Sequence, residues 1–122
     1  MSAVVEPQPK PTGNGEDVHE ALEYDIQCLI QGVDPKIPEQ LMATLTLACE
    51  AKATLAYTED QPSHVVLKDV LADLSDRIDV GEQKYGTRLK TNNGRDPILD
   101  AYQKLLDASH YLKQAQIEGK LR

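Results

Sequence analysis

The segment Thr91–Asp107, TNNGRDPILDAYQKLLD, contains the clearest structural signals in the sequence. Its Asn-Asn-Gly triplet at 92–94 is a turn signal. The following Asp96-Pro97 pair is typical of a helix start, with a carboxylate N-cap before a proline at the first helical position. An apolar face then repeats at helical spacing, and it consists of Ile98, Tyr102, Leu105, Ser109 and Leu112. The segment therefore predicts a polar loop and an amphipathic helix, which ends near Glu118 and keeps this face inward.

Three further helices are predicted upstream of this segment. The first covers about Asp17 to Gln31 and begins with a capping box formed by Asp17 and Glu20. The second runs from about Pro38 to Tyr57, and the third from about His64 to Lys84 with Ser63 as its N-cap. No segment has the pattern of a convincing strand. The predicted class is all-α, in the form of a four-helix antiparallel bundle with short loops.

The second predicted helix is apolar on two sides. One side carries Ile37, Leu41, Leu45, Ala48 and Leu55, and the other carries Met42, Cys49, Ala53 and Ala56. A helix of this kind usually lies at the centre of a bundle or in a dimer interface. The sequence therefore favours a homodimer or a higher oligomer.

The first sixteen residues, MSAVVEPQPKPTGNGE, differ in composition from the rest of the chain. Pro7, Pro9 and Pro11 alternate with polar residues, which rules out a helix or a central strand. Residues 1–16 are therefore predicted to be a flexible or extended arm, and 17–122 a single helical domain. An arm of this kind either has no fixed structure or docks on a partner.

The composition excludes several functional classes. The net charge is -7, so nonspecific binding to nucleic acid or to an anionic membrane is not expected. The sequence has no apolar run long enough to span a bilayer and no signal-peptide pattern, which favours a cytoplasmic location. Cys28 and Cys49 are too far apart for a CxxC motif and are interpreted as reduced core residues. The three histidines have no zinc-like spacing.

Acidic residues on two predicted helices are candidate metal ligands. Asp100 and Asp107 share one face of the last helix with Lys104 and Tyr111. The third helix carries an acidic stripe that includes Asp76, Asp79 and Glu82. Carboxylates on facing helices could hold Mg²⁺, which also binds water and substrate phosphate. The alternative is a solvated helix face with an Asp100–Lys104 ion pair, which would contribute little stability.

The connector before the last helix is rich in cations. Lys84, Arg88, Lys90 and Arg95 concentrate positive charge in an otherwise acidic chain. Together with a helix N-terminus and an acidic stripe, they would suit a nucleotide polyphosphate with a bridging Mg²⁺. The predicted nucleotide-binding residues are Lys84, Tyr85, Arg88, Asn93 and Arg95. The alternative is a loop that balances the charge of its neighbouring helices.

The motifs KYGT, NGRD and DAYQ…LLDA..YL, within residues 70–116, resemble phage-encoded MazG-like proteins, small members of the all-α nucleoside triphosphate pyrophosphohydrolase group. The resemblance covers somewhat more than a third of the chain and does not include its N-terminal half. It implies a helical bundle that dimerises or tetramerises. It also implies Mg²⁺-dependent cleavage of an NTP or dNTP into the monophosphate and pyrophosphate.

The sequence departs from the metal-binding motifs of that group. In the group, one helix offers a cluster of glutamates and the next offers E-x-x-D. The second motif falls on Lys104–Asp107, which reads K-L-L-D, and no E-E-x-x-E occurs in the chain. Asp76, Asp79 and Glu82 are the nearest substitutes for the first motif. An ammonium in place of a metal ligand would repel the ion by about 4 kcal/mol per unit of the ion's charge at ~4 Å and an effective dielectric of ~20.

Two functional hypotheses follow from the resemblance and its departures. The favoured one is a MazG-like phage protein that binds a nucleotide or a protein partner without efficient catalysis, and so sequesters nucleotide, antagonises a host defence or belongs to a virion or larger complex. The alternative is a pyrophosphohydrolase in which Asp107 and Asp100 are catalytic. Its Mg²⁺ ligands would be Asp107, Asp100, Asp79, Glu82 and Asp76. Either protein would act in the host cytoplasm, and a virion component would be virion-associated.

Overall fold

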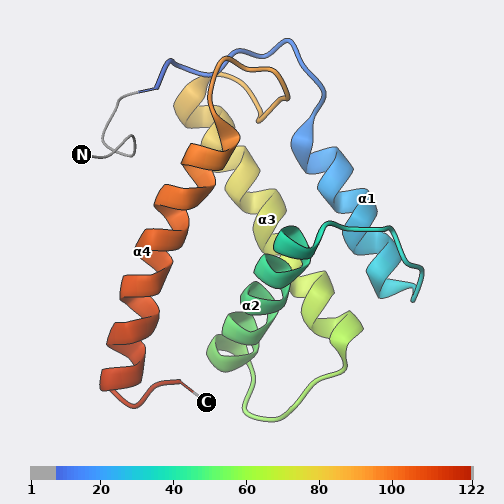
Figure 1. The fold of residues 1–122 in the computed structure, drawn as a ribbon. Helices are drawn as coiled ribbons and strands as arrows, with labels where there is room; N and C mark the ends of the chain where they lie inside the picture. The colour runs from blue at the N-terminus through green and yellow to red at the C-terminus, as the bar shows by residue number, and fades with distance from the viewer. Residues whose placement is uncertain (1–7, 122) are drawn as a thin grey trace.

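The computed structural model describes residues 8–121, and this part of the chain forms four helices and no strand (Figure 1). The helices are α1 (Val18–Ile30), α2 (Glu39–Ala56), α3 (Ser63–Tyr85) and α4 (Pro97–Ile117). The all-α class and the four-helix architecture predicted from the sequence are therefore confirmed. The first seven residues of the predicted arm lie outside the described part.

Side-chain caps fix the starts of two helices. The Asp17 carboxylate accepts a hydrogen bond from the backbone N–H of Glu20 at 3.0 Å and so begins α1. Asp96 does the same for α4, where it accepts from the N–H groups of Ile98 and Leu99. The prediction that Ser63 caps α3 is wrong. Helical geometry there already begins at Ser63, so the N-cap position falls on Pro62, which has no side-chain donor or acceptor.

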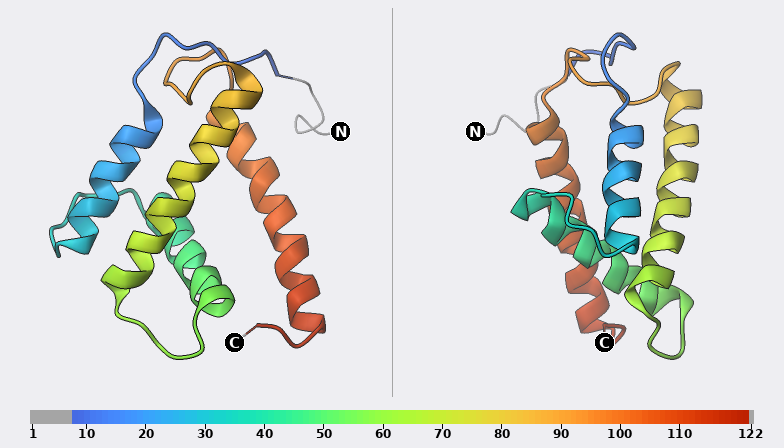
Figure 2. Two further views of the ribbon diagram at one scale, coloured as in Figure 1. Left: turned by 180° about the vertical axis from the view of Figure 1, so that it is seen from behind. Right: turned by 90° about the vertical axis from the view of Figure 1, so that its right-hand side faces the viewer.

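The core lies where three helices meet. Its buried centre is made of Ile26 from α1, Leu45 from α2 and Leu71 from α3, and Ile26 is completely buried. Both α1 and α2 pack on α3, which makes α3 the central helix (Figure 2). The partly buried side chains around this centre are Leu22, Leu29, Ile30, Ile37, Leu41, Leu67 and Leu74. The apolar faces of these three helices thus pack against one another within a single chain.

Helix α4 stands apart from this core. In the described part of the chain no Cα atom of α4 lies within 8 Å of a Cα atom of another helix, and none of its residues is buried (Figure 1). The prediction that its apolar face points inward is therefore wrong for the single chain. Ile98 is 76% exposed and Leu105 is 48% exposed. Helical periodicity shows which side of a helix is apolar, but it does not show which surface covers that side.

The arm from residue 8 onward is extended and lies along the connector between α3 and α4 (Figure 1). The N–H of Thr12 donates to the carbonyl of Asn93 at 3.1 Å, and the N–H of Thr91 donates to the carbonyl of Glu16 at 2.8 Å. The Thr91 hydroxyl also accepts from the Glu16 N–H at 2.9 Å. These bonds satisfy backbone groups in both irregular segments. The arm is therefore part of the fold from residue 8.

We expect Gly15→Ala to lower the free energy of unfolding by about 2 kcal/mol, the usual scale of overpacking. A Cβ at Gly15 would lie 1.7 Å from the Thr91 carbonyl oxygen, so the arm and the connector would have to separate. The matched control is Gly81→Ala in α3, where a Cβ meets nothing within 4 Å. That change should stabilise the helix by about 0.5–1 kcal/mol. Urea unfolding measures both, and equal stability of Gly15→Ala and the native chain would contradict this arm position.

Candidate functional site

A cavity of about 360 Å³ lies between the C-terminal end of α3, the connector and the first turns of α4. Its size is in the range of small-molecule sites, roughly 300–1,000 Å³. The arm also contributes one residue to its wall. The lining residues are Pro11, Ile78, Gly81, Tyr85, Thr87, Arg88, Leu89, Arg95, Asp100, Gln103 and Lys104. The cavity therefore brings together segments that are far apart in the sequence.

Three of the five predicted nucleotide-binding residues line this cavity, namely Tyr85, Arg88 and Arg95. The other two do not. Lys84 is exposed, and its ammonium lies 5.2 Å from the centre of the Tyr85 ring. Asn93 is buried, and its side-chain oxygen accepts a hydrogen bond from the Arg95 N–H at 3.0 Å, so it shapes the turn.

Arg88 is held by a carboxylate from the other end of the chain. Its Nε donates to Asp17 Oδ2 at 2.7 Å, and its Nη1 lies 3.6 Å from Asp79 Oδ1. Lys90 Nζ also lies 3.6 Å from Asp17. Burial by itself raises the pKa of Asp17, but the hydrogen bonds from Arg88 and Glu20 and the charges of Arg88 and Lys90 lower it to about 2. Asp17 thus stays ionised and fixes the connector against the start of α1.

Arg95 and Asp100 form a bidentate ion pair at the wall of the cavity. Arg95 Nη2 donates to Asp100 Oδ1 at 2.7 Å and its Nε donates to Oδ2 at 3.1 Å. Gln8 of the arm also donates to Oδ1 at 2.7 Å. The hydrogen bond from Arg95 lowers the pKa of Asp100 despite partial burial, with the charges of Arg95 and Lys104 and the Gln8 bond adding to it. The ion-pair partner of Asp100 is therefore Arg95.

The predicted metal ligands do not come together in one chain. Asp76, Asp79 and Glu82 are exposed on α3, and Asp107 is exposed on α4. Asp100 is occupied by Arg95. Within residues 8–121 no group of three His, Cys, Asp or Glu side chains is placed to hold a metal ion. A single chain therefore does not assemble a Mg²⁺ site from these residues, and their metal-binding and catalytic assignments stay predictions.

Sequence patterns missed several contributors to the cavity. The sequence identifies Lys104 as a departure from a metal motif or as an ion-pair partner of Asp100, yet it also lines the cavity beside two arginines. Asp17 was assigned only as a helix cap, yet it also neutralises Arg88 and Lys90. The surplus of cations in the connector was a signal that carboxylates must lie nearby. Spacing cannot identify a partner 71 residues away.

Comparisons of the chain with protein-family models, with curated proteins and with solved structures found no match. In the part of the chain that the structure describes, no helix is both long and apolar enough to cross a membrane. The basis for a function is therefore the cavity and the surfaces of this chain itself.

Proposed function

We propose that this chain is a MazG-like phage protein that binds the phosphates of a nucleotide in the cavity between α3 and α4 without efficient catalysis. The observation that carries the proposal is the charge of the cavity wall. Arg88, Arg95 and Lys104 line the wall with one carboxylate, Asp100. Asp100 pairs with Arg95, and Asp17 and Asp79 lie against Arg88, whereas no described carboxylate lies within ion-pair distance of Lys104. The charge of the Lys104 ammonium therefore attracts an anion to this wall and not a cation.

Lys104 is the cation best placed to bind a phosphate. Arg88 and Arg95 already have carboxylate partners, whereas none of the described carboxylates lies within ion-pair distance of Lys104. The N-terminus of α4 is not an alternative site, because the Asp96 side chain takes the N–H groups of Ile98 and Leu99. The half-exposed Tyr85 ring at the same wall is a surface on which a base can stack. The wall therefore offers groups for phosphate and for base.

The absence of efficient catalysis follows from the same residues. Phosphate cleavage in this group of enzymes relies on bound metal ions, and a lysine beside Asp107 repels such an ion. The proposal therefore has the protein sequester nucleotide in the host cytoplasm. It includes a homo-oligomer, because Ile98, Tyr102 and Leu105 on the apolar face of α4 are exposed in the single chain. The alternative function remains that of a pyrophosphohydrolase, and the pyrophosphate-release assay described below tests both functions.

We expect ATP or dATP to bind in a calorimetric titration, and Lys104→Met to weaken binding about 10-fold or more. Loss of one hydrogen bond to a charged group costs about 1.5–3 kcal/mol, and 1.4 kcal/mol is tenfold in affinity. The matched control is Lys113→Met on the same helix, which lies outside the cavity wall. Binding that is absent for a panel of NTPs and dNTPs, or equal in both variants, would contradict the proposal.

The same proteins, incubated with Mg²⁺ or Mn²⁺, are tested for pyrophosphate release. Under the proposal the native chain shows no turnover above background. Turnover that Asp107→Ala abolishes would replace the proposal with the enzyme. Lys104→Glu restores the E-x-x-D pattern of the resembled group, and activity gained only in this variant would show that Lys104 is what prevents catalysis. A chain that neither binds nor cleaves nucleotide would shift the assignment to a protein partner.

A further inference from the structure

The arm consists of two parts that are held in different ways. Residues 12–18 are fixed to the connector by backbone hydrogen bonds, such as the one from the Val18 N–H to the Leu89 carbonyl at 2.9 Å. Residues 8–11, Gln-Pro-Lys-Pro, contain two prolines and therefore lack two backbone donors. This segment, the strap, instead contacts the polar segment Arg95–Asp100 at the edge of the cavity.

Three hydrogen bonds within the described part of the chain hold the strap to this edge. The Gln8 side chain uses both of its ends, since its oxygen accepts from the Asp96 N–H at 2.5 Å and its nitrogen donates to Asp100 Oδ1 at 2.7 Å. The Pro9 carbonyl accepts from Arg95 Nη1 at 2.9 Å. None of the four strap residues is fully buried. A segment held by a few partly exposed bonds opens at a much lower free-energy cost than the core.

The Pro9 carbonyl engages the part of Arg95 that Asp100 leaves open. Nε and Nη2 of Arg95 bind the two Asp100 oxygens at 3.1 and 2.7 Å, which fixes the orientation of the guanidinium. The remaining nitrogen, Nη1, donates to the strap. Because Arg95 and Lys104 line the same cavity, a phosphate that both residues bind would compete with Pro9 for Nη1.

This competition couples the position of the strap to phosphate binding. An anionic oxygen is a better acceptor than the neutral Pro9 carbonyl, because a charge-assisted hydrogen bond is roughly twice as strong as a neutral one. A phosphate that engages Nη1 therefore removes one of the bonds that hold the strap. By reciprocal linkage, a closed strap weakens the binding of that phosphate. The apparent affinity is the intrinsic affinity reduced by the fraction of chains whose strap is open.

We propose that the strap is an autoinhibitory element: when it is closed the Pro9 carbonyl withholds Arg95 from a polyphosphate, and a polyphosphate bound by Lys104 and Arg95 opens it. The proposal rests on the proposed function, in which Lys104 binds phosphate, and adds the regulation of that site. Asp100 keeps Arg95 oriented in both states. Opening therefore moves residues 8–11 and leaves residues 12–18 in place.

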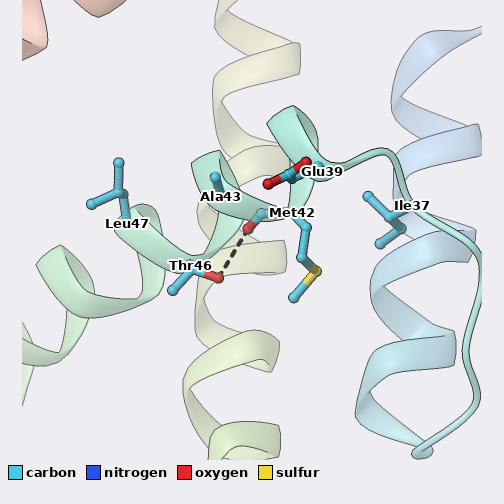
Figure 3. A pocket seen from close by; sticks show the side chains of 6 residues that line it. All are labelled: Ile37, Glu39, Met42, Ala43, Thr46 and Leu47. Carbon is cyan, nitrogen blue, oxygen red and sulfur yellow. Dashed lines mark hydrogen bonds between the residues drawn. The ribbon is translucent and has the colours of Figure 1, made fainter.

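An inorganic polyphosphate is a suitable probe of this cavity. A further hollow in the surface lies on α2, as the close view shows (Figure 3). Its lining residues are Ile37, Glu39, Met42, Ala43, Thr46 and Leu47. The one charged side chain among them, Glu39, is a carboxylate and repels phosphate. Polyphosphate binding therefore reports on the cavity between α3 and α4 and not on the hollow of α2.

The test is a calorimetric titration of the full chain with inorganic tripolyphosphate. Gln8→Ala removes two of the bonds that hold the strap. It should bind the probe about 5- to 10-fold more tightly than the native chain, because more chains have an open strap. The matched control is Gln61→Ala in the loop between α2 and α3, where the side chain is exposed, and it should bind like the native chain. In an Arg95→Met background Gln8→Ala should have no effect, because the competed nitrogen is absent.

Hydrogen exchange gives a second readout that requires no variant. The Asp96 N–H donates to Gln8, so tripolyphosphate should speed its exchange in the native chain. The Val18 N–H, which the anchored part of the arm holds, should keep its rate. An Asp96 rate that saturating tripolyphosphate leaves unchanged would overturn the strap.

The affinities separate failure of the strap from failure of the proposed function. Equal affinity of the native chain and Gln8→Ala would overturn the strap and leave nucleotide binding intact. A gain from Gln8→Ala that persists in the Arg95→Met background would overturn Arg95 as the competed group. Binding by Gln8→Ala alone would support the strap and contradict nucleotide binding by the native chain. No binding by any of these proteins would overturn both proposals.

Discussion

Replacing Ile26 with alanine is expected to lower the free energy of unfolding by about 3 kcal/mol, within the range of roughly 2–5 kcal/mol for such changes in a core. Ile26 is the one side chain in the described part of the chain with no exposed surface, and it contacts Leu45 and Leu71 from the other two core helices. The change removes apolar contact with α2 and α3 at once. With only three helices around this point, few neighbours can move in to fill the space.

Urea unfolding followed by circular dichroism at one protein concentration measures this effect. Ile26→Val keeps most of the volume and should cost about 1 kcal/mol. Leu55→Ala is the surface control, because Leu55 is 86% exposed, and it should change stability by less than about 0.5 kcal/mol. A cost below 1 kcal/mol for Ile26→Ala would mean that the core is centred elsewhere.

Removing the Asp17 carboxylate is the second change with a large expected effect. Asp17→Asn keeps a side-chain cap on α1 but loses the ion pairs with Arg88 and Lys90. The lowered pKa corresponds to about 2 kcal/mol, and solvent around Arg88, whose side chain is 27% exposed, reduces this to about 1.5 kcal/mol. Asp17→Ala also loses the cap, which adds about 1 kcal/mol. The native chain is therefore expected to be the most stable, Asp17→Asn less stable, and Asp17→Ala the least stable.

The pH dependence distinguishes the charge from the cap. The pKa of Asp17 falls from an ordinary value of 3.8 to about 2 on folding, so its contribution is fully present above the unfolded value. It is lost as the pH falls from about 4 to about 2. Over this range Asp17→Asn should lose less stability than the native chain, because it has no carboxylate to protonate there. Parallel stability curves for the two proteins would contradict the ion pair.

The elements of the fold were predictable because their signals are local. Asp96-Pro97 marks the start of α4, and the apolar repeat around Ile26 and Leu71 marks the faces of α1 and α3. The predictions that are wrong concern which surface covers each apolar face. The sequence correctly predicts which face of α4 is apolar. In the single chain, however, this face is exposed and does not point toward the core. Periodicity is a property of one helix, whereas burial depends on another surface.

The candidate site was predictable only in part for the same reason. Arg88 and Arg95 are predicted from the cluster of positive charge in the connector, and Tyr85 belongs to the KYGT motif. All three residues line one cavity. Asp100 lies five residues from Arg95, but the other contacts that organise the site join positions that no spacing rule connects. Asp17 reaches Arg88 across 71 residues, and Gln8 reaches Asp100 across 92. Such contacts follow from the fold and not from the pattern of the sequence.

The seating of the arm on the connector has a consequence for the order of events during synthesis of the chain. Helices α1, α2 and α3 all lie before the connector in the sequence, and the last of them ends at Tyr85. They therefore emerge from the ribosome before the connector and α4. Chains begin to fold from the N-terminus as they emerge. Until then Asp17 has no Arg88 to bind, and Thr12 and Glu16 have no backbone partner. Residues 12–17 therefore reach their final positions only after the connector has been translated, and the cavity is completed later than the core.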